Sequence, residues 1–179
     1  TDVLNFAFNN SELSNSQKTG ALSLLYKKGD PTNLENWRPI TLLNTDYKIA
    51  ARILATRLQK VIHKIISMDQ QGYIKNRYIG YNLRLIQDII DYTELLHLDG
   101  AVIFLDFRKA FDTIEWPFLF KALSYFGFKS DFIRWIKTLY SNCNTYILNN
   151  GWMSSCFSPE RGIRQGCPIS ALLFIIAAE

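Results

Sequence analysis

The stretch AVIFLDFRKAFDTIEW, residues 101–116, is the part of the chain that decides its fold. It opens with five apolar residues, 101–105, and a short run rich in Val, Ile and Phe predicts a buried β-strand. Asp106 follows the run directly. Burial of an unpaired carboxylate is costly, so we expect Asp106 to have a partner, and a divalent cation is a suitable one. The alternative for a single such residue is an aspartate that faces solvent or caps the next turn.

The second informative stretch is RQGCPIS, residues 164–170, which lies between a loop with two glycines and a strongly apolar segment. Pro168 is placed to open a helix that runs towards the last residue. The apolar segment, residues 171–178, is too short to cross a bilayer. We therefore expect a buried helix there and no membrane association.

Composition limits the class of protein. The chain has 179 residues, of which 48% are hydrophobic, and this suits one globular domain. Its formal charge of +4 and its pI of about 8.9 permit contact with nucleic acid without requiring it. The three cysteines have no metal-ligand spacing, and an odd number of them indicates free thiols in a reducing compartment.

The order of expected elements predicts an α+β fold in one compact unit. Residues 1–19 are polar and predict a loop, and Asn150-Gly151 is typical of a hairpin turn. Strands are expected at 20–27, 38–43 and 101–105. Helices are expected at 46–66 (capped by Asn44 or Thr45), at 81–98, from Pro117 to about Gly127, after Ser130 as the cap residue, and from Pro168.

Four segments together resemble the reverse transcriptases of non-LTR (LINE-type) retrotransposons. They are YKKGDPTNLENWRPITLLNTDYKIAARILATRL, DQQGYIKNR, FLDFRKAFDTIEW and ERGIRQGCPISALLFIIAAE, and they extend from about residue 24 to the last residue. The joint pattern is highly specific, whereas any one segment alone is not. The resemblance implies a right-hand polymerase fold, with mainly helical fingers at 1–99 and the first part of the palm, with an interleaved fingers hairpin, at 100–179.

The same resemblance implies a function. Enzymes of this family copy retrotransposon RNA into DNA by nucleotidyl transfer at two metal ions, for which Mg²⁺ is the expected cofactor. The implied partners are an RNA template, a DNA primer and deoxynucleoside triphosphates. The implied location is intracellular, in the nucleus or in a cytoplasmic ribonucleoprotein.

The resemblance also assigns roles to residues around the first motif. Asp106 matches the first metal-binding carboxylate, and Phe107 is expected to offer its backbone carbonyl to a metal ion. Phe111 matches the aromatic residue that crowds the 2′ position of the sugar and so rejects ribonucleotides. The alternative for Phe111 is an ordinary core aromatic, because Ala110 and Ile114 are apolar neighbours.

Further roles concern the substrate. Gln165 and Gly166 match the pair that approaches the templating base pair. Lys27 and Arg38 match basic residues that hold the incoming triphosphate, and a guanidinium group suits that task because it binds phosphate through two N–H groups. Both could instead be ordinary charged residues beside strands, and Lys28 could serve in place of Lys27.

The chain departs from the family pattern in one respect. The other two catalytic carboxylates of the family lie in a Tyr/Phe-Ala-Asp-Asp turn, and this sequence holds no Asp-Asp pair. We interpret this as truncation and expect residues 1–179 alone to have no primer-extension activity. The alternative function is a non-catalytic nucleic-acid-binding scaffold from a decayed or incomplete element.

Basic residues outside these motifs are candidates for contact with nucleic acid. Lys48 and Arg52 lie opposite the apolar stripe of the helix expected at 46–66, and a basic helical face can follow a phosphate backbone. Lys75 and Arg77 stand among tyrosines, a mixture suited to single strands. Both sets could equally be surface residues. Asp112 is expected to cap the next turn or to pair with Arg108 or Lys109; a role as a second metal ligand is the alternative.

Overall fold

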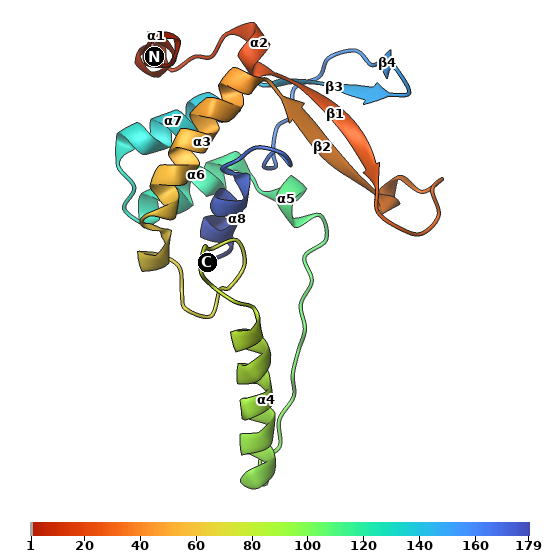
Figure 1. Ribbon diagram of the computed structural model, residues 1–179, viewed down its shortest axis with the longest axis vertical. Coiled ribbons are helices and arrows are strands. Elements are labelled where there is room, and N and C mark those ends of the chain that lie inside the picture. Colours follow the sequence, from red (N-terminus) through yellow and green to blue (C-terminus); the bar gives the residue numbers. More distant parts are fainter. Residues whose placement is uncertain (1) are drawn as a thin grey trace.

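A computed structural model describes residues 2–179 and shows an α+β architecture with one mixed sheet (Figure 1). The sheet is four-stranded in the order β2-β1-β3-β4. Its strands are β1 (Thr19–Tyr26), β2 (Trp37–Leu43), β3 (Asn144–Asn149) and β4 (Trp152–Met153). The helices found in this part of the chain are α1 (Asp2–Asn10), α2 (Asn15–Lys18), α3 (Thr45–Gln59), α4 (Gly80–Leu95), α5 (Ala110–Thr113), α6 (Trp116–Tyr125), α7 (Ser130–Tyr140) and α8 (Ser170–Ala178), with 3₁₀ turns at Leu34–Asn36 and Ile62–Lys64.

The sheet joins segments that are far apart in the sequence. Strands β1 and β2 form an antiparallel hairpin in which Gly20 lies opposite Leu43 and Tyr26 opposite Trp37. The other edge of β1 pairs in parallel with β3, which begins opposite Thr19. Strand β4 returns from the Asn150-Gly151 turn, and both turn residues have positive φ, as this type of hairpin requires. The expected strands at 20–27 and 38–43 and the expected hairpin are confirmed.

The hydrophobic core lies among α3, α6, α7 and α8. Helix α8 is apolar on nearly every side, and Leu173, Ile175 and Ile176 are at most 1% exposed. Helix α3 begins as expected, because the side chain of Asn44 accepts a hydrogen bond from the backbone N–H of Asp46. It ends at Gln59, earlier than expected, and the turns that follow lead to the 3₁₀ segment.

The N-terminal residues differ from the expected loop. Within residues 2–19 the chain forms α1, α2 and the first residue of β1. Ser14 and Gln17 form a reciprocal capping box that starts α2. Phe8 of α1 stacks on Trp135 of α7 at a centroid distance of 5.3 Å, and the Arg134 guanidinium lies over the same ring. Tertiary contacts therefore stabilise helices that the polar local sequence does not indicate.

The largest correction concerns residues 101–105, which do not form the expected strand. The segment is extended and runs alongside α4, away from the core (Figure 1). Ile103, Phe104 and Leu105 are about four-fifths exposed, at 79%, 81% and 82%. All the strand pairs found among residues 2–179 lie elsewhere, so this apolar run has no neighbouring strand there to complete its hydrogen bonds or cover its side chains.

The remaining differences are shifts of element ends. Helix α4 begins at Gly80 and ends at Leu95, close to the expected 81–98, but none of its residues is buried. Helix α6 has Pro117 in its first turn, as expected. Helix α7 starts at Ser130, but Lys129 rather than Ser130 is its cap residue, and α8 starts two residues after Pro168. No helix among residues 2–179 is long and apolar enough to cross a membrane.

Candidate functional site

A cleft of about 810 Å³ lies between the β1–β2 hairpin, the segment 106–112 and the loop before α8. These three parts of the chain are separated by long stretches of sequence and meet only in the folded protein. The cleft is lined by Leu24, Lys27, Leu34, Glu35, Trp37, Arg38, Pro39, Ile40, Tyr73, Asp106, Phe107, Arg108, Lys109, Ala110, Phe111, Asp112, Arg164, Gln165, Gly166, Cys167, Ser170 and Ala171.

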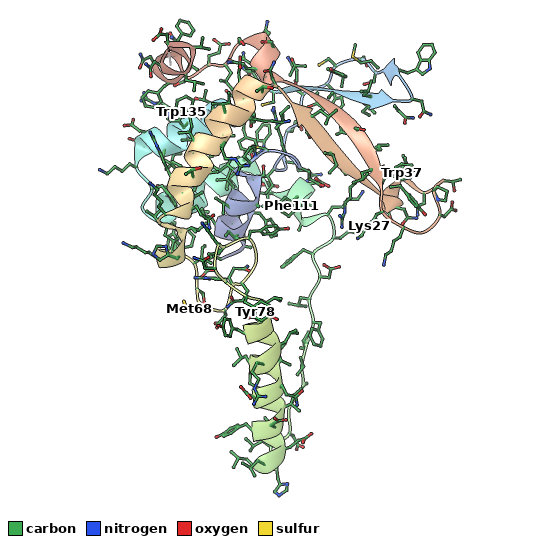
Figure 2. The ribbon with its side chains drawn as sticks, in the orientation of Figure 1. Lys27, Trp37, Met68, Tyr78, Phe111 and Trp135 are labelled. Carbon is green, nitrogen blue, oxygen red and sulfur yellow. The ribbon has the colours of Figure 1, made fainter. Side chains whose placement is uncertain are left out.

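Seven residues expected to bind substrate or metal line this one cleft. They are Lys27, Arg38, Asp106, Phe107, Phe111, Gln165 and Gly166. Lys27 and Trp37 lie together at the far end of the hairpin, and Phe111 lies beside α8 (Figure 2). The fold therefore brings the sequence-predicted substrate residues together, whereas Lys48, Arg52, Lys75 and Arg77 do not line the cleft.

The basic end of the cleft is built by the hairpin. The backbone N–H of Lys27 donates to the carbonyl of Asn36 across the loop at 2.9 Å, and Arg38 lies opposite Leu25 in the β1–β2 register. The side chains of Lys27 and Arg38 are both exposed. This arrangement offers two cations to solvent at one end of the cleft, where an anionic ligand could reach them.

Three carboxylates line the cleft, and two of them have protein partners. Glu35 forms an ion pair with Arg108, and Asp112 accepts a hydrogen bond from Gln165. For the exposed carboxylate of Asp106, no hydrogen bond or ion pair is found to other residues in the 2–179 range. A hard cation takes oxygen ligands, so the free carboxylate and the adjacent Phe107 carbonyl are suitable in kind. Within residues 2–179, however, no group of three or more His, Cys, Asp or Glu side chains is placed to hold a metal ion.

Phe111 combines the two expected environments, because it lines the cleft and also packs against the core. Its ring stacks on Phe174 of α8 at a centroid distance of 4.6 Å, with an angle of 10° between the planes. Tyr73 meets the same ring edge-on at 6.1 Å. One face of the aromatic ring is thereby fixed by α8, which limits its movement within the cleft.

The loop 162–166 is held against α5 and against strand β2. Gly162 donates its N–H to the carbonyl of Ile114 at 2.7 Å and accepts a hydrogen bond from the indole of Trp116 at 2.8 Å. Gly166 has φ of +111°, and a Cβ there would lie 2.6 Å from the carbonyl oxygen of Thr41. Glycine is therefore required at position 166 both by backbone conformation and by close approach.

Asp112 has a partner that the sequence did not suggest. Its carboxylate accepts a hydrogen bond from Nε2 of Gln165 at 3.0 Å, so the expected pairing with Arg108 or Lys109 is wrong. Arg108 instead pairs with Glu35. Both contacts join residues far apart in the chain, and nothing in the local sequence pattern indicates them.

A buried polar cluster surrounds Arg164, one of the residues that line the cleft. The Arg164 guanidinium lies 5.1 Å from the ring centroid of Tyr47, and its Nη2 donates to the carbonyl of Lys18 at 3.4 Å. Burial raises the pKa of Tyr47, and also that of Tyr140, so both hydroxyl groups stay protonated and remain hydrogen-bond donors. Arg164 is only 8% exposed, a structural role that its position in RQGCPIS does not reveal.

The basic residues outside the cleft have different environments. Lys48 and Arg52 are exposed on α3, and Lys75 is exposed beside α4. Arg77 is half-buried, and its guanidinium donates to the backbone carbonyls of Ile66, Ser67 and Gln70. Its charge is thus used to hold the loop between the core and α4.

Comparison with known proteins agrees with these motifs. Residues 25–179 match the family described as reverse transcriptase (RNA-dependent DNA polymerase). The Transposon TX1 uncharacterized 149 kDa protein of Xenopus laevis is 37% identical over 177 residues, which cover 99% of this chain and 14% of that protein.

Two further relatives are polyproteins of R2 elements. The retrovirus-related Pol polyprotein from type-1 retrotransposable element R2 of Popillia japonica is 31% identical over 153 residues, covering 85% of this chain and 21% of the relative. The corresponding polyprotein from type-2 element R2DM of Drosophila melanogaster is 26% identical over 145 residues, which cover 81% of this chain and 14% of that polyprotein. The chain thus spans only 14–21% of the length of these relatives. With its motifs, its cleft and these matches, the chain belongs to the reverse transcriptase family and is of the non-LTR retrotransposon type.

Proposed function

We propose that this chain forms the nucleotide-binding part of an RNA-directed DNA polymerase that copies retrotransposon RNA into DNA. The single observation that supports the proposal most is the convergence of three distant segments on one cleft, with a basic end, a free carboxylate and an aromatic ring. The proposed substrates are deoxynucleoside triphosphates, and the proposed partners are an RNA template and a DNA primer.

The basic end of the cleft would receive the triphosphate. Lys27 and Arg38 are exposed there and supply two positive charges, and Arg38 can donate two N–H groups to one phosphate. Lys109 and Arg164 also line the cleft, and a further lining cation, Arg108, is paired with Glu35. In this arrangement Lys27 and Arg38 bind and orient the triphosphate, while the pair of Glu35 and Arg108 links the hairpin to the segment after Asp106.

The residues around Asp106 would hold the metal ion and the sugar. Asp106 and the Phe107 carbonyl are the proposed Mg²⁺ ligands, and when bound the metal ions would neutralise charge on the reacting phosphate oxygens. Phe111 presents its ring to the sugar, where a 2′-hydroxyl would collide with it. Gln165 and Gly166, which also line the cleft, contact the templating base pair.

We further propose a division of the chain into fingers and palm. We assign residues 1–99 to the fingers and residues 100–179 to the first part of the palm with its interleaved hairpin. The support is that the β1–β2 hairpin and the segment 106–112 both line the cleft. Lys48, Arg52, Lys75 and Arg77 are proposed to contact the nucleic acid, the first three through exposed charges. Activity on retrotransposon RNA implies an intracellular location, in the nucleus or in a cytoplasmic ribonucleoprotein.

The test is primer extension on an RNA template by the full-length protein that contains this chain, with Mg²⁺ present. We expect extension by the unaltered protein and a loss of at least about a hundredfold for Asp106→Ala, since one catalytic group contributes on the order of 10²–10³. Asp131→Ala is the matched control, because Asp131 lies on α7 outside the cleft and pairs with Arg134. Activity that survives Asp106→Ala would contradict the proposal.

The piece 1–179 gives a second measurement. Its sequence holds Asp106 but no Asp-Asp pair, so we expect no extension from it under the same conditions. RNA binding by the full-length protein without any extension would instead support a non-catalytic scaffold. Competitive use of ribo- and deoxynucleotides by Phe111→Val tests the sugar assignment, and an unchanged ratio would remove it.

A further inference from the structure

We propose that Asp112 is a positioning residue for nucleotide binding, and that it acts by fixing the side-chain amide of Gln165. The inference rests on the proposed function, because it concerns the same cleft. Asp112 follows Phe111 directly in α5, and Gln165 follows Arg164 in the loop before α8. The two residues therefore connect the side of the cleft assigned to the sugar with the side assigned to the base pair.

The contact itself is a hydrogen bond between side chains. Nε2 of Gln165 donates to Oδ1 of Asp112 at 3.0 Å, across 53 residues of sequence. Both side chains are half-buried, so water competes with the bond less than it would at the surface. A carboxylate acceptor makes the bond charge-assisted, and such bonds are about twice as strong as neutral ones.

The backbone around this bond is already aligned by other contacts. Ile163 donates its N–H to the carbonyl of Phe111 at 2.8 Å, and Gly162 donates to the carbonyl of Ile114 at 2.7 Å. The indole of Trp116 donates to the carbonyl of Gly162 at 2.8 Å. These bonds hold α5 and the loop together without help from Asp112. Loss of the Asp112 carboxylate should therefore release the Gln165 side chain while leaving the loop in place.

The other side of Gln165 is fixed to strand β2. The carbonyl of Gln165 accepts a hydrogen bond from the backbone N–H of Thr41 at 2.7 Å, and Gly166 approaches the Thr41 carbonyl closely. Strand β2 also contains Arg38, which is assigned to the triphosphate. Gln165 thus has its backbone attached to β2 and its side chain attached to α5, and both elements contribute residues to the lining of the cleft.

The identity of the acceptor determines which way the amide faces. An ionised carboxylate only accepts hydrogen bonds, so Gln165 must turn its NH₂ group towards Asp112 and its oxygen away. This leaves one N–H and the amide oxygen of Gln165 for other partners in a fixed arrangement. An asparagine at position 112 could accept from NH₂ or donate to the oxygen, and would allow both orientations of the Gln165 amide.

The experiment measures single-nucleotide incorporation by the full-length protein with Asp112→Ala, Asp112→Asn, Gln165→Ala and the double variant Asp112→Ala/Gln165→Ala. For Asp112→Ala we expect KM for the deoxynucleotide to rise about tenfold, as the loss of a hydrogen bond to a charged group implies, with a smaller change in kcat. Asp112→Asn retains an acceptor, and its KM should rise by less than about threefold. Asp131→Ala, on α7, is the control and should leave KM unchanged.

The double variant separates positioning from stability. If Asp112 acts through Gln165, the change Asp112→Ala should raise KM no further in a protein that already carries Gln165→Ala. An equal rise in KM on removal of Asp112 in both backgrounds would overturn the inference, as would an unchanged KM for Asp112→Ala, whatever its melting temperature. If Asp112→Ala does not fold, Asp112→Asn in the same two backgrounds gives the same comparison. A wild-type protein that extends no primer refutes the proposed function, which is a different result.

Discussion

Helix α8 and the segment 101–107 contain the same kinds of residue but lie in opposite environments. Helix α8, SALLFIIAA, is enclosed by α3 and α6, and Leu173 is 0% exposed. The segment AVIFLDF extends beside α4, and Leu105 is 82% exposed. A buried side chain of this size contributes about 1.5–3 kcal/mol relative to an exposed one. The difference shows that an apolar run stabilises a fold only when other elements surround it.

The largest effect expected from this comparison comes from a matched pair of leucine substitutions. Leu173→Ala should lower the free energy of unfolding by about 2–5 kcal/mol, because it leaves a cavity in the core. Leu105→Ala should change it by less than about 0.5 kcal/mol, because the side chain is already in solvent. Urea unfolding of the 179-residue chain measures both. Similar losses for the two variants would show that residues 101–107 are packed in solution.

A second pair tests the close approach of the loop to β2. Gly166→Ala should lower the free energy of unfolding by about 1–3 kcal/mol, because a positive φ is unfavourable for alanine and the new Cβ would meet the Thr41 carbonyl. Gly100 is exposed and directly precedes the segment 101–107, and a Cβ there would meet nothing within 4 Å. Gly100→Ala should therefore be neutral or stabilise the chain by up to about 1 kcal/mol. Thermal unfolding of the two variants provides the measurement, and equal melting temperatures would argue against the loop position.

A smaller effect on stability is expected at the loop that joins the core to α4. Arg77 holds the loop that leads from the core to α4 through the carbonyls of Ile66, Ser67 and Gln70. Arg77→Ala should lower the free energy of unfolding by about 1–2 kcal/mol, since several backbone acceptors lose a charged donor. Amide hydrogen exchange should accelerate in residues 66–72 and stay unchanged in α8. Lys75→Ala, an exposed neighbour, is the control, and an equal effect from it would mean that the guanidinium contacts are unimportant.

The smallest effect concerns the ion pair that links the hairpin to the exposed segment. Glu35 and Arg108 are both more than half exposed, with side-chain exposures of 52% and 78%. Exposed pairs contribute about 0.2–1 kcal/mol, so Glu35→Gln should lower stability by less than about 1 kcal/mol. The loss should shrink further in high salt. A larger, salt-independent loss in urea unfolding would show that the pair is shielded from solvent.

Local sequence was sufficient to predict the elements whose partners lie close by in the chain. The strands of the β1–β2 hairpin, the Asn44 cap of α3 and the hairpin at Asn150-Gly151 were all predicted from residue types and spacing. Helix α8 was also predicted, because its apolar residues pack against helices that the chain provides. The apolar run at residues 101–105 predicted a strand equally strongly, and this prediction was wrong. An apolar run shows that side chains are hydrophobic, but it does not show that a partner strand is present.

The contacts within the cleft could not be predicted from local sequence, because they join residues that are far apart in the chain. Phe111 and Gln165 were assigned by resemblance, but the hydrogen bond between Gln165 and Asp112 spans 53 residues and has no local pattern. The helices at the N-terminus were missed for the same reason, because Phe8 stacks on Trp135 far along the chain. The buried position of Arg164 over Tyr47 likewise depends on the fold and not on its neighbours in sequence.

The parallel pairing of β1 with β3 also affects how the protein is made. Strand β1 ends at Tyr26, but its second partner begins only at Asn144. During synthesis at about 5–20 residues per second, the β1–β2 hairpin must wait several seconds with one edge unpaired. An unpaired strand edge is a site at which other chains can add and aggregate. The nascent polypeptide therefore passes through an interval in which a chaperone that covers this edge would raise the yield of folded protein.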